Sequence, residues 1–256
     1  MKYQSVHIDY SVEFLSSFHC GAGEGRGLAD RLVRRDADDF LVIPGSTIKG
    51  LVRENCEFLT GLFGVSDGKP HLPQDEKEIK KYFQTLFSNY NIIHAIFGSP
   101  RQAGLVNFDD ASLDDEWKTF FSNDRSPEHN LRQKRWQVEE RTRVRINRHT
   151  GAAVEGALFT SNYGKTALTF KGKIYGSYAF PAMFSGIFSY PLPLLVLLTG
   201  LKLVENIGAD RSTGCGRCQI EINRLKSNGK EENPEHVFEA IDELQYLSTA
   251  AEEWNQ

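Results

Sequence analysis

Hydrophobic and polar residues alternate in three stretches of the chain, a period-two pattern that predicts strands. The first stretch is 6–14, and the others lie within 165–179 and 216–225. Two short apolar runs, 40–43 and 105–108, predict further strands. The predicted strands are therefore distributed over most of the chain.

Apolar residues spaced three and four positions apart predict helices between these strands. The segment after position 43 carries such a stripe, which consists of Ile48, Leu51, Val52, Phe58, Leu59 and Leu62. We expect further helices at 76–87, at 194–204, and from Pro234 to position 247, where proline suits a helix start. The helix at 194–204 is apolar enough to be buried.

Two segments lack either pattern, since 112–137 is polar and irregular and 226–233 has the composition of a polar linker. The order strand, helix, strand occurs early in the chain and again near its end. This order favours a ferredoxin-like α+β sheet with long insertions. Open sheets of this kind often bind RNA, but a fold alone does not decide function.

Composition limits the classes of partner. The 256 residues include 30 basic and 34 acidic side chains, so a site for nucleic acid has to be local. No apolar run is long enough to cross a bilayer and the first residues do not resemble a signal peptide, so we expect a cytoplasmic protein without a membrane partner. Cys215 and Cys218 have the spacing of half a zinc site, but no second close pair completes it.

The segment 43–50 reads Ile-Pro-Gly-Ser-Thr-Ile-Lys-Gly and predicts a turn that opens a helix. Ser46 or Thr47 is expected to cap that helix. Lys49 and Arg53 are four residues apart and share one face near the helix start, where backbone N–H groups and cations suit a phosphate. The alternative is an ordinary capped helix with a solvated basic face.

The strongest charge feature is 132–148, which holds seven basic and two acidic residues. Arg141, Arg143 and Arg145 alternate with uncharged residues, so in a strand their guanidinium groups project from one face. Arg148 adds a further cation. Arginine pairs with phosphate and stacks on bases, which favours nucleic acid. The alternative is a solvated face, or internal pairing with the two glutamates at 139 and 140.

The segment 207–216 combines glycines with one cation. Gly208, Gly214 and Gly216 permit close backbone approach, and Arg211 supplies the charge. The alternative is a helix end followed by a turn. The segment matches neither a P-loop nor a dinucleotide-binding fingerprint.

Carboxylates cluster among arginines in the segment 26–39, at Asp30, Asp36, Asp38 and Asp39. Beside a phosphate-binding surface such groups suit metal binding or proton transfer. The alternative is a loop of surface ion pairs. The sequence shows no arrangement typical of Ser-His-Asp catalysis.

In their order along the chain, these segments resemble the RAMP superfamily of CRISPR proteins. The matching segments are Phe18-His-Cys-Gly21, 43–50 with Arg53, Phe97-Gly98, Asp110-Ala111, Asn147-Arg-His-Thr-Gly151 and 208–216. The similarity is strongest to the repeated backbone subunit of type III effector complexes. Asn147 replaces the family's aspartate and Cys215 its usual aromatic residue, which indicates a divergent subtype or a subunit with a fixed place.

The resemblance implies an α+β fold, a modified ferredoxin-like (RRM-like) palm with an inserted thumb hairpin and extra helical insertions. A single domain would span 1–225, with an insertion at about 65–97 and the thumb at about 141–165. A linker and a C-terminal helix would occupy 226–256.

The resemblance also implies binding to guide (CRISPR) RNA, to target RNA and to other RAMP subunits. The expected RNA-binding residues are Ser46, Thr47, Lys49, Arg53, Arg141, Arg143, Arg145, Arg148, Arg211, Gly214 and Gly216. Target RNA would be cut with Mg²⁺ or another divalent metal, with Asp30 as catalytic residue and metal ligand and Asp36 as the second choice.

Two alternatives stay open within the same superfamily. The chain could be a structural RNA-binding subunit without catalysis. It could also be a metal-independent endonuclease that processes repeat RNA with His19 as acid or base. The turn at 43–50 argues against the second alternative, because such processing enzymes generally lack it.

Overall fold

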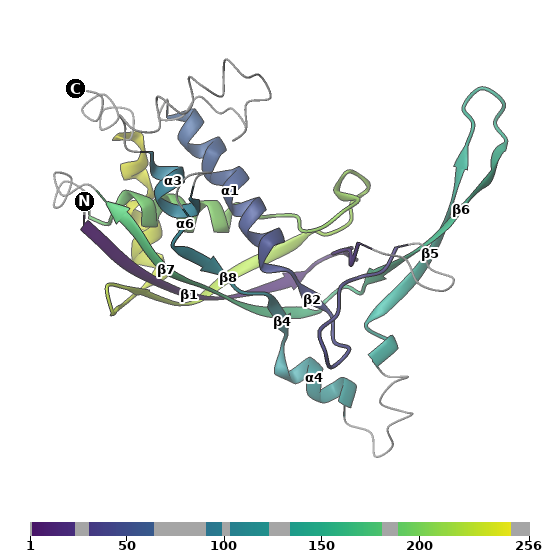
Figure 1. The fold of residues 1–256 in the computed structure, drawn as a ribbon, viewed down its shortest axis with the longest axis horizontal. Helices are drawn as coiled ribbons and strands as arrows, with labels where there is room; N and C mark the ends of the chain where they lie inside the picture. Colours follow the sequence, from purple (N-terminus) through teal and green to yellow (C-terminus); the bar gives the residue numbers. More distant parts are fainter. Residues whose placement is uncertain are drawn as a thin grey trace.

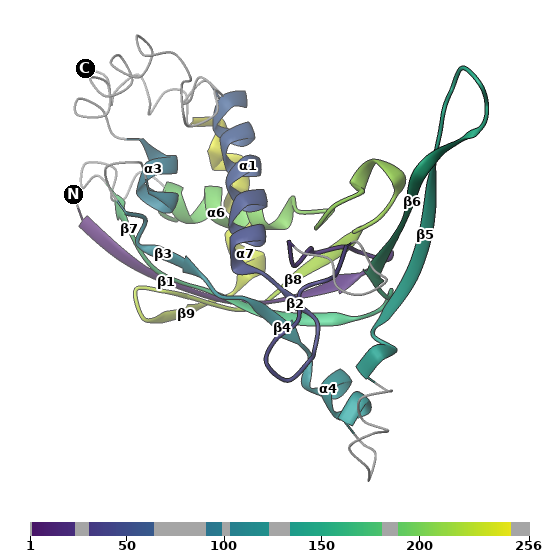
Figure 2. The same cartoon turned by 45° about the vertical axis from the view of Figure 1, so that its right-hand side comes forward.

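The computed structural model describes residues 2–23, 31–63, 91–98, 103–122, 134–180 and 189–246, and the structural statements below refer to these ranges. An antiparallel sheet has the strand order β2-β4-β7-β1-β8-β9, and β3 also pairs with β7. Helices α1, α3, α6 and α7 lie on one face of this sheet, and the ribbon β5–β6 projects away from it (Figures 1 and 2).

The sheet contains β1 (Lys2–Phe14), β2 (Val42–Ile43), β3 (Val106–Phe108), β4 (Ala111–Leu113), β7 (Thr169–Phe180), β8 (Cys218–Ser227) and β9 (Lys230–Glu232). The ribbon consists of β5 (Val138–Ile146) and β6 (Ala153–Gly164). The helices are α1 (Gly45–Leu62), α3 (Ile92–Phe97), α4 (Asp115–Ser122), α6 (Leu192–Lys202) and α7 (Pro234–Glu239), with 3₁₀ turns η2 (Arg211–Thr213) and η3 (Ala240–Tyr246).

The chain order of the central elements is β1, α1, β4, β7, α6, β8, while their order across the sheet is β4-β7-β1-β8. This arrangement of two strand–helix–strand units is the ferredoxin-like one. The predicted α+β palm is therefore confirmed. The predicted thumb is confirmed as the β5–β6 hairpin, which begins three residues before the expected boundary and ends one residue before it.

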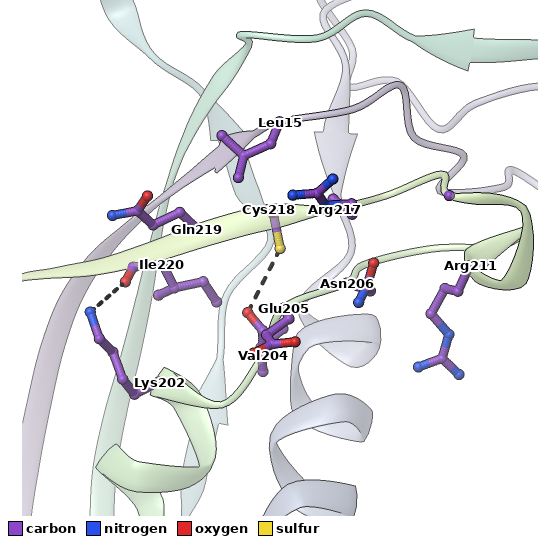
Figure 3. Close-up of a pocket in the computed structure, with 11 residues that line it drawn as sticks. Leu15, Lys202, Val204, Glu205, Asn206, Arg211, Arg217, Cys218, Gln219 and Ile220 are labelled. Atoms are coloured by element: carbon purple, nitrogen blue, oxygen red, sulfur yellow. Dashed lines mark hydrogen bonds between the residues drawn. The ribbon is translucent and has the colours of Figure 1, made fainter.

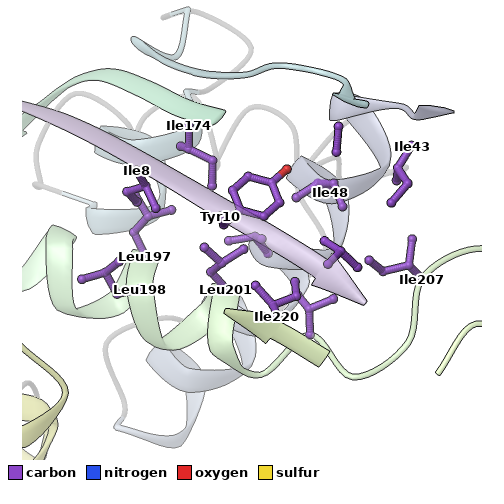
Figure 4. Close-up of a cluster of buried hydrophobic side chains, with 14 of the residues drawn as sticks. Ile8, Tyr10, Ile43, Ile48, Ile174, Leu197, Leu198, Leu201, Ile207 and Ile220 are labelled. Atoms are coloured by element: carbon purple, nitrogen blue, oxygen red, sulfur yellow. The ribbon is translucent and has the colours of Figure 1, made fainter. Parts of the chain in front are cut away.

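The core lies between the sheet and its helices (Figure 4). Alternate residues of β1 face it, and Val6, Ile8, Tyr10, Val12 and Phe14 are all buried. Every residue of α6 from Leu192 to Leu201 is buried, which explains why this helix is apolar on all sides. Gly200 lets α6 approach α1, because a Cβ there would lie 2.4 Å from the Cys56 sulfur.

The predicted stripe of α1 is only partly correct. Ile48, Val52 and Leu59 are buried, but Phe58 and Leu62 are 63% and 65% exposed. Cys56 is a buried position of α1 that the prediction omitted.

The prediction of an irregular segment at 112–137 is wrong for 112–122, because this part contains β4 and α4, while 123–133 lie outside the described residues. Trp117 and Phe121 are four residues apart on α4, and their rings stack with centroids 5.8 Å apart. That spacing was the overlooked sign of a helix.

The prediction of a linker at 226–233 is also wrong. β8 continues to Ser227 and pairs with β9. Asn228 and Gly229 form the intervening turn with positive φ angles of 50° and 77°, and Asn-Gly is a strong hairpin sequence.

The terminal helix begins at Pro234 as predicted, and the Asn233 side chain caps it by accepting the Glu235 N–H at 3.0 Å. It ends at Glu239 and continues as η3. The predicted helix at 76–87 lies outside the described residues. None of the described helices is long and apolar enough to cross a membrane.

Candidate nucleic-acid interface

The start of α1 is capped from a distant part of the chain. Helix α1 begins at Gly45, and the Gly45 N–H donates to Asp110 Oδ1 at 2.7 Å. The expected cap by Ser46 or Thr47 is therefore wrong, because both residues lie inside the first turn. A Cβ at Gly45 would lie 2.1 Å from the Phe108 carbonyl oxygen, so only glycine allows this approach.

Replacing Asp110 with alanine should lower the free energy of unfolding by about 1 kcal/mol, the usual value of an N-cap. Chemical denaturation measures this change. Asp110→Asn keeps an acceptor oxygen, so it should lose less than half as much. An equal loss in both variants would argue that the cap is unimportant.

An open hollow of about 500 Å³ lies beside the start of α1. It brings together residues from four separated segments, which are His19, Cys20, Gly21, Arg31, Ser46, Thr47, Gly50, Leu51, Gly208, Ala209 and Arg211. The fixed charges in this lining belong to Arg31 and Arg211, and both are positive. The hollow therefore suits an anion.

Backbone contacts hold the glycine-rich segment against this hollow. The Ala209 N–H donates to the His19 carbonyl oxygen at 2.9 Å. Gly208 has a φ of 98°, and a Cβ there would lie 2.5 Å from the same oxygen. The close approach that the sequence suggested for Gly208 is thus observed.

Lys49 and Arg53 share a face of α1 as predicted, but neither lines the hollow. Arg53 Nε donates to Glu57 Oε1 at 2.8 Å, and its guanidinium lies 5.9 Å from the centre of the Phe97 ring of α3. Partial burial, and then the charge of Arg53, lower the pKa of Lys49. Arg53 therefore faces α3, and the role of both residues in RNA binding stays a prediction.

Asp210 joins the glycine-rich segment to the base of the thumb. The Tyr163 hydroxyl of β6 donates to Asp210 Oδ2 at 2.5 Å. Arg31 and Arg143 each place a guanidinium nitrogen 3.4 Å from the same oxygen. The hydrogen bond from Tyr163, together with these two cations, lowers the pKa of the Asp210 carboxyl below its usual range.

Arg141 also has partners within the chain. Its guanidinium donates to Ser17 Oγ at 2.6 Å and forms a 2.5 Å ion pair with Glu139. It lies 4.8 Å from the centre of the Tyr163 ring. The alternative interpretation of internal pairing thus holds for Arg141, while Arg143 pairs with Asp210 instead.

The row of arginines is therefore divided along the ribbon. Arg141 and Arg143 are held at its base, whereas Arg145 and Arg148 are exposed toward its tip and form no ion pair with any described residue. The directly paired Val144 and Leu158 are exposed on the opposite face of the ribbon. Charge available to an external anion is thus concentrated at the distal half.

The two other glycines of the segment 207–216 have different surroundings. Gly216 has a φ of 79°, and a Cβ there would lie 2.2 Å from the Ile207 carbonyl oxygen. Gly214 has a φ of 86° with nothing near a Cβ. Arg211 is exposed and lines both the hollow beside α1 and a second hollow (Figure 3).

Of the two predicted catalytic residues, Asp30 lies outside the described residues. Asp36 Oδ1 accepts the N–H groups of Asp38 and Phe40 at 3.0 Å and 2.9 Å, so this carboxylate stabilises a turn. Its catalytic role stays a prediction. Within the described ranges, no three His, Cys, Asp or Glu side chains gather to hold a metal.

All four cysteines are buried free thiols. Burial raises the pKa of Cys218 to about 12, which makes it a protonated thiol at neutral pH.

Sequence reasoning missed Asp210 and Tyr163. The sequence did hold one indication of a role for Asp210, because this carboxylate stands next to Arg211 inside a glycine-rich segment.

A sequence model of the RAMP superfamily matches residues 11–219. No curated protein matches the chain. The fold is similar to a chain of the "Type III-B Cmr-beta bound to cognate target RNA", with a TM-score of 0.53, 12% identity, and coverage of 84% of this chain and 96% of that one. A chain of the "Type III-B Cmr-beta" apo state gives a TM-score of 0.51, 13% identity, and coverage of 85% and 97%. The family match covers most of the chain, which therefore belongs to the RAMP superfamily.

Proposed function

We propose that this protein is a guide-RNA-binding subunit of a type III CRISPR effector complex. The observation that carries the proposal is the hollow beside α1, where separated segments meet and where the fixed charges of the lining are arginines. Membership of the RAMP superfamily and the fold shared with a chain of Cmr-beta bound to target RNA support it. Target RNA and other RAMP subunits are the remaining partners in this proposal.

The geometry suits a phosphate in the hollow. Arg31 and Arg211 supply planar donors that match phosphate oxygens, and the first turn of α1 adds the positive end of a helix dipole. The hydroxyl groups of Ser46 and Thr47 add two further donors. An RNA strand that continues from the hollow along the thumb would meet Arg145 and Arg148.

Replacing Arg145 and Arg148 together with glutamine should weaken binding to single-stranded RNA about tenfold, from two exposed contacts at about 0.7 kcal/mol each. The slope of log affinity against log salt concentration should fall by about 0.7 for each phosphate that is no longer bound. Fluorescence anisotropy over a salt series measures both quantities.

Lys171→Gln is the matched control. Lys171 is an exposed cation of the sheet that pairs with Asp114 at 2.9 Å, away from the ribbon. Its loss should change neither the RNA affinity nor the salt slope. Equal effects of the control and the thumb variant would mean that binding depends on net charge alone, which contradicts the proposed interface.

The finer part of the proposal is that the subunit cuts target RNA with a divalent metal at Asp30. The next residue, Arg31, lines the hollow, and its carbonyl oxygen accepts the Asn162 N–H of the thumb at 2.9 Å. Asp30→Ala in the assembled complex should abolish cutting while guide RNA stays bound. The Asp36→Ala complex should still cut target RNA, while the turn that the Asp36 carboxylate stabilises becomes less stable.

Two outcomes would replace this finer proposal with its alternatives. If the complex binds target RNA but cuts none, the subunit is structural. If EDTA leaves cutting intact, the His19 alternative gains support. His19 is 3% exposed, and its Nδ1 lies 2.7 Å from the Asn162 carbonyl oxygen, so Nδ1 is the donor and Nε2 is left as the acceptor.

A further inference from the structure

A second hollow of about 460 Å³ is lined in part by Arg211 and Gly214 of the glycine-rich segment (Figure 3). The end of α6, the connection that follows it and the start of β8 form its walls. Its lining includes three cations, Lys202, Arg211 and Arg217, against one carboxylate, Glu205. Leu15 also lines it and is 52% exposed.

This hollow adjoins a stretch of β8 that lacks a neighbouring strand. On the side away from β1, the Cys218 N–H donates to the Glu205 carbonyl oxygen at 2.9 Å, and pairing with β9 begins at Leu225. Residues 219–224 lie between these points, and no described strand pairs with them on that side. At about 3.3 Å per residue this stretch is about 20 Å long, the length of an ordinary strand.

From Cys218 to Ile222 the main-chain groups of this edge point outward at alternate residues, and the register of β8 against β1 shifts at Asn223, between the pairs Tyr10–Ile222 and Asp9–Arg224. Cys218 directs its N–H away from β1, so Ile220 and Ile222 direct their N–H and C=O groups the same way. Among described residues, Lys202 Nζ reaches the Ile220 carbonyl oxygen at 3.3 Å. No described main-chain group pairs with the outward groups of Ile222.

The surroundings of the edge suit a polypeptide better than RNA. Leu15 is 52% and Leu203 is 43% exposed, and both lie beside the edge or its flanking connection. RNA recognition uses stacking and charge, whereas an added strand uses main-chain hydrogen bonds and apolar contacts. The cations of the rim complement acidic side chains.

We propose that residues 219–224 of β8 accept a short extended segment of another polypeptide, which adds as a strand and carries acidic side chains next to apolar ones. This inference concerns a protein partner and goes beyond the RNA-binding function proposed above. Main-chain hydrogen bonds to Ile220 and Ile222 would give affinity, and Lys202 and Arg217 would select acidic residues.

The test uses the full chain and three fluorescent probes of equal length. The first is a seven-residue peptide that alternates glutamate with valine, the second replaces each glutamate with lysine, and the third is oligouridine. Anisotropy should show saturable binding of the acidic peptide and at least tenfold weaker binding of the basic one. Amide hydrogen exchange within 219–224 should slow when the acidic peptide is bound.

Two variants separate the edge from its charges. Ile222→Pro removes an outward N–H while proline remains tolerated on a sheet edge, and it should weaken peptide binding at least tenfold. Lys202→Glu combined with Arg217→Glu reverses two charges and also removes the Lys202 contact with the Ile220 carbonyl oxygen, and it should have a similar effect. Both variants should bind RNA within twofold of the original chain.

Three outcomes would overturn the inference. The acidic peptide would fail to bind, or it would bind without slower exchange in 219–224, or oligouridine would displace it. The last result would assign this surface to the RNA path. None of these outcomes depends on whether the hollow beside α1 binds guide RNA, so the two proposals fail separately.

Discussion

Replacing Gly216 with alanine should lower the free energy of unfolding by about 2–5 kcal/mol. A Cβ would lie 2.2 Å from the Ile207 carbonyl oxygen, and the φ of 79° is costly for any residue with a side chain. The backbone cannot move aside, because the Gly216 N–H donates to Ser17 and its carbonyl accepts from Ile207, both at 2.8 Å. Left-handed strain of about 1–2 kcal/mol and overpacking of about 1–3 kcal/mol together approach the net stability of a domain.

Gly214→Ala is the matched control for this change. Gly214 lies in the same segment with a φ of 86°, but nothing lies within 4 Å of a Cβ there. The free energy of unfolding of Gly214→Ala should therefore fall only by the cost of left-handed backbone strain, about 1–2 kcal/mol. Urea denaturation measures both variants, and similar midpoints would show that the contact with Ile207 relaxes easily.

Replacing Asp210 with alanine should release the thumb from the palm. Three donors converge on this carboxylate, from Tyr163, Arg31 and Arg143. Without it, two guanidinium groups face each other without an anion, and hydrogen bonds to a charged group are worth about 1.5–3 kcal/mol each. We expect amide exchange in 138–164 to become at least tenfold faster, as measured by mass spectrometry.

Asp114→Asn provides the control for the thumb experiment. Its carboxylate accepts a hydrogen bond from Lys171 at 2.9 Å, and among the described residues no hydrogen bond or ion pair joins it to the ribbon. Exchange in 138–164 should stay unchanged in this variant. Faster exchange in both variants would indicate general destabilisation rather than release of the thumb.

The same carboxylate predicts a dependence on pH. The pKa of Asp210 is lowered in the folded state, so its stabilisation is present at neutral pH. It is lost as the pH falls below about 3.9, the value of a free aspartate, and through the lowered pKa. The difference in stability between Asp210→Asn and the original chain should therefore disappear in strong acid, as acid denaturation curves would show.

The strands of the palm could be predicted because alternation reports burial directly. β1 and β8 each place alternate residues in the core, and α6 is apolar all round because every side of it is covered. The hairpin of β8 and β9 was missed although Asn228 and Gly229 mark its turn. The cap of α1 could not be predicted from local spacing, since Asp110 is 65 positions from Gly45.

In the candidate site, too, local structure could be predicted from the sequence, whereas contacts between distant residues could not. The spacing of Arg141 and Arg143 correctly predicted a strand, and pairing of Arg141 with Glu139 was among the alternatives, but the distant partners were not predicted. Arg143 meets Asp210, which is 67 positions away, and Arg141 meets Ser17, which is 124 positions away. Periodicity describes one element at a time, whereas these contacts depend on how three segments pack.

The central position of β1 has a consequence for synthesis on the ribosome. This strand is made first, yet one of its neighbours is β8, and Ser5 donates to Asn228 Oδ1 across a separation of 223 positions. Such non-local pairing is slow to form and keeps an edge open meanwhile. The nascent palm cannot close until residue 227 has left the exit tunnel, so truncation before β8 should yield aggregates rather than a smaller folded unit.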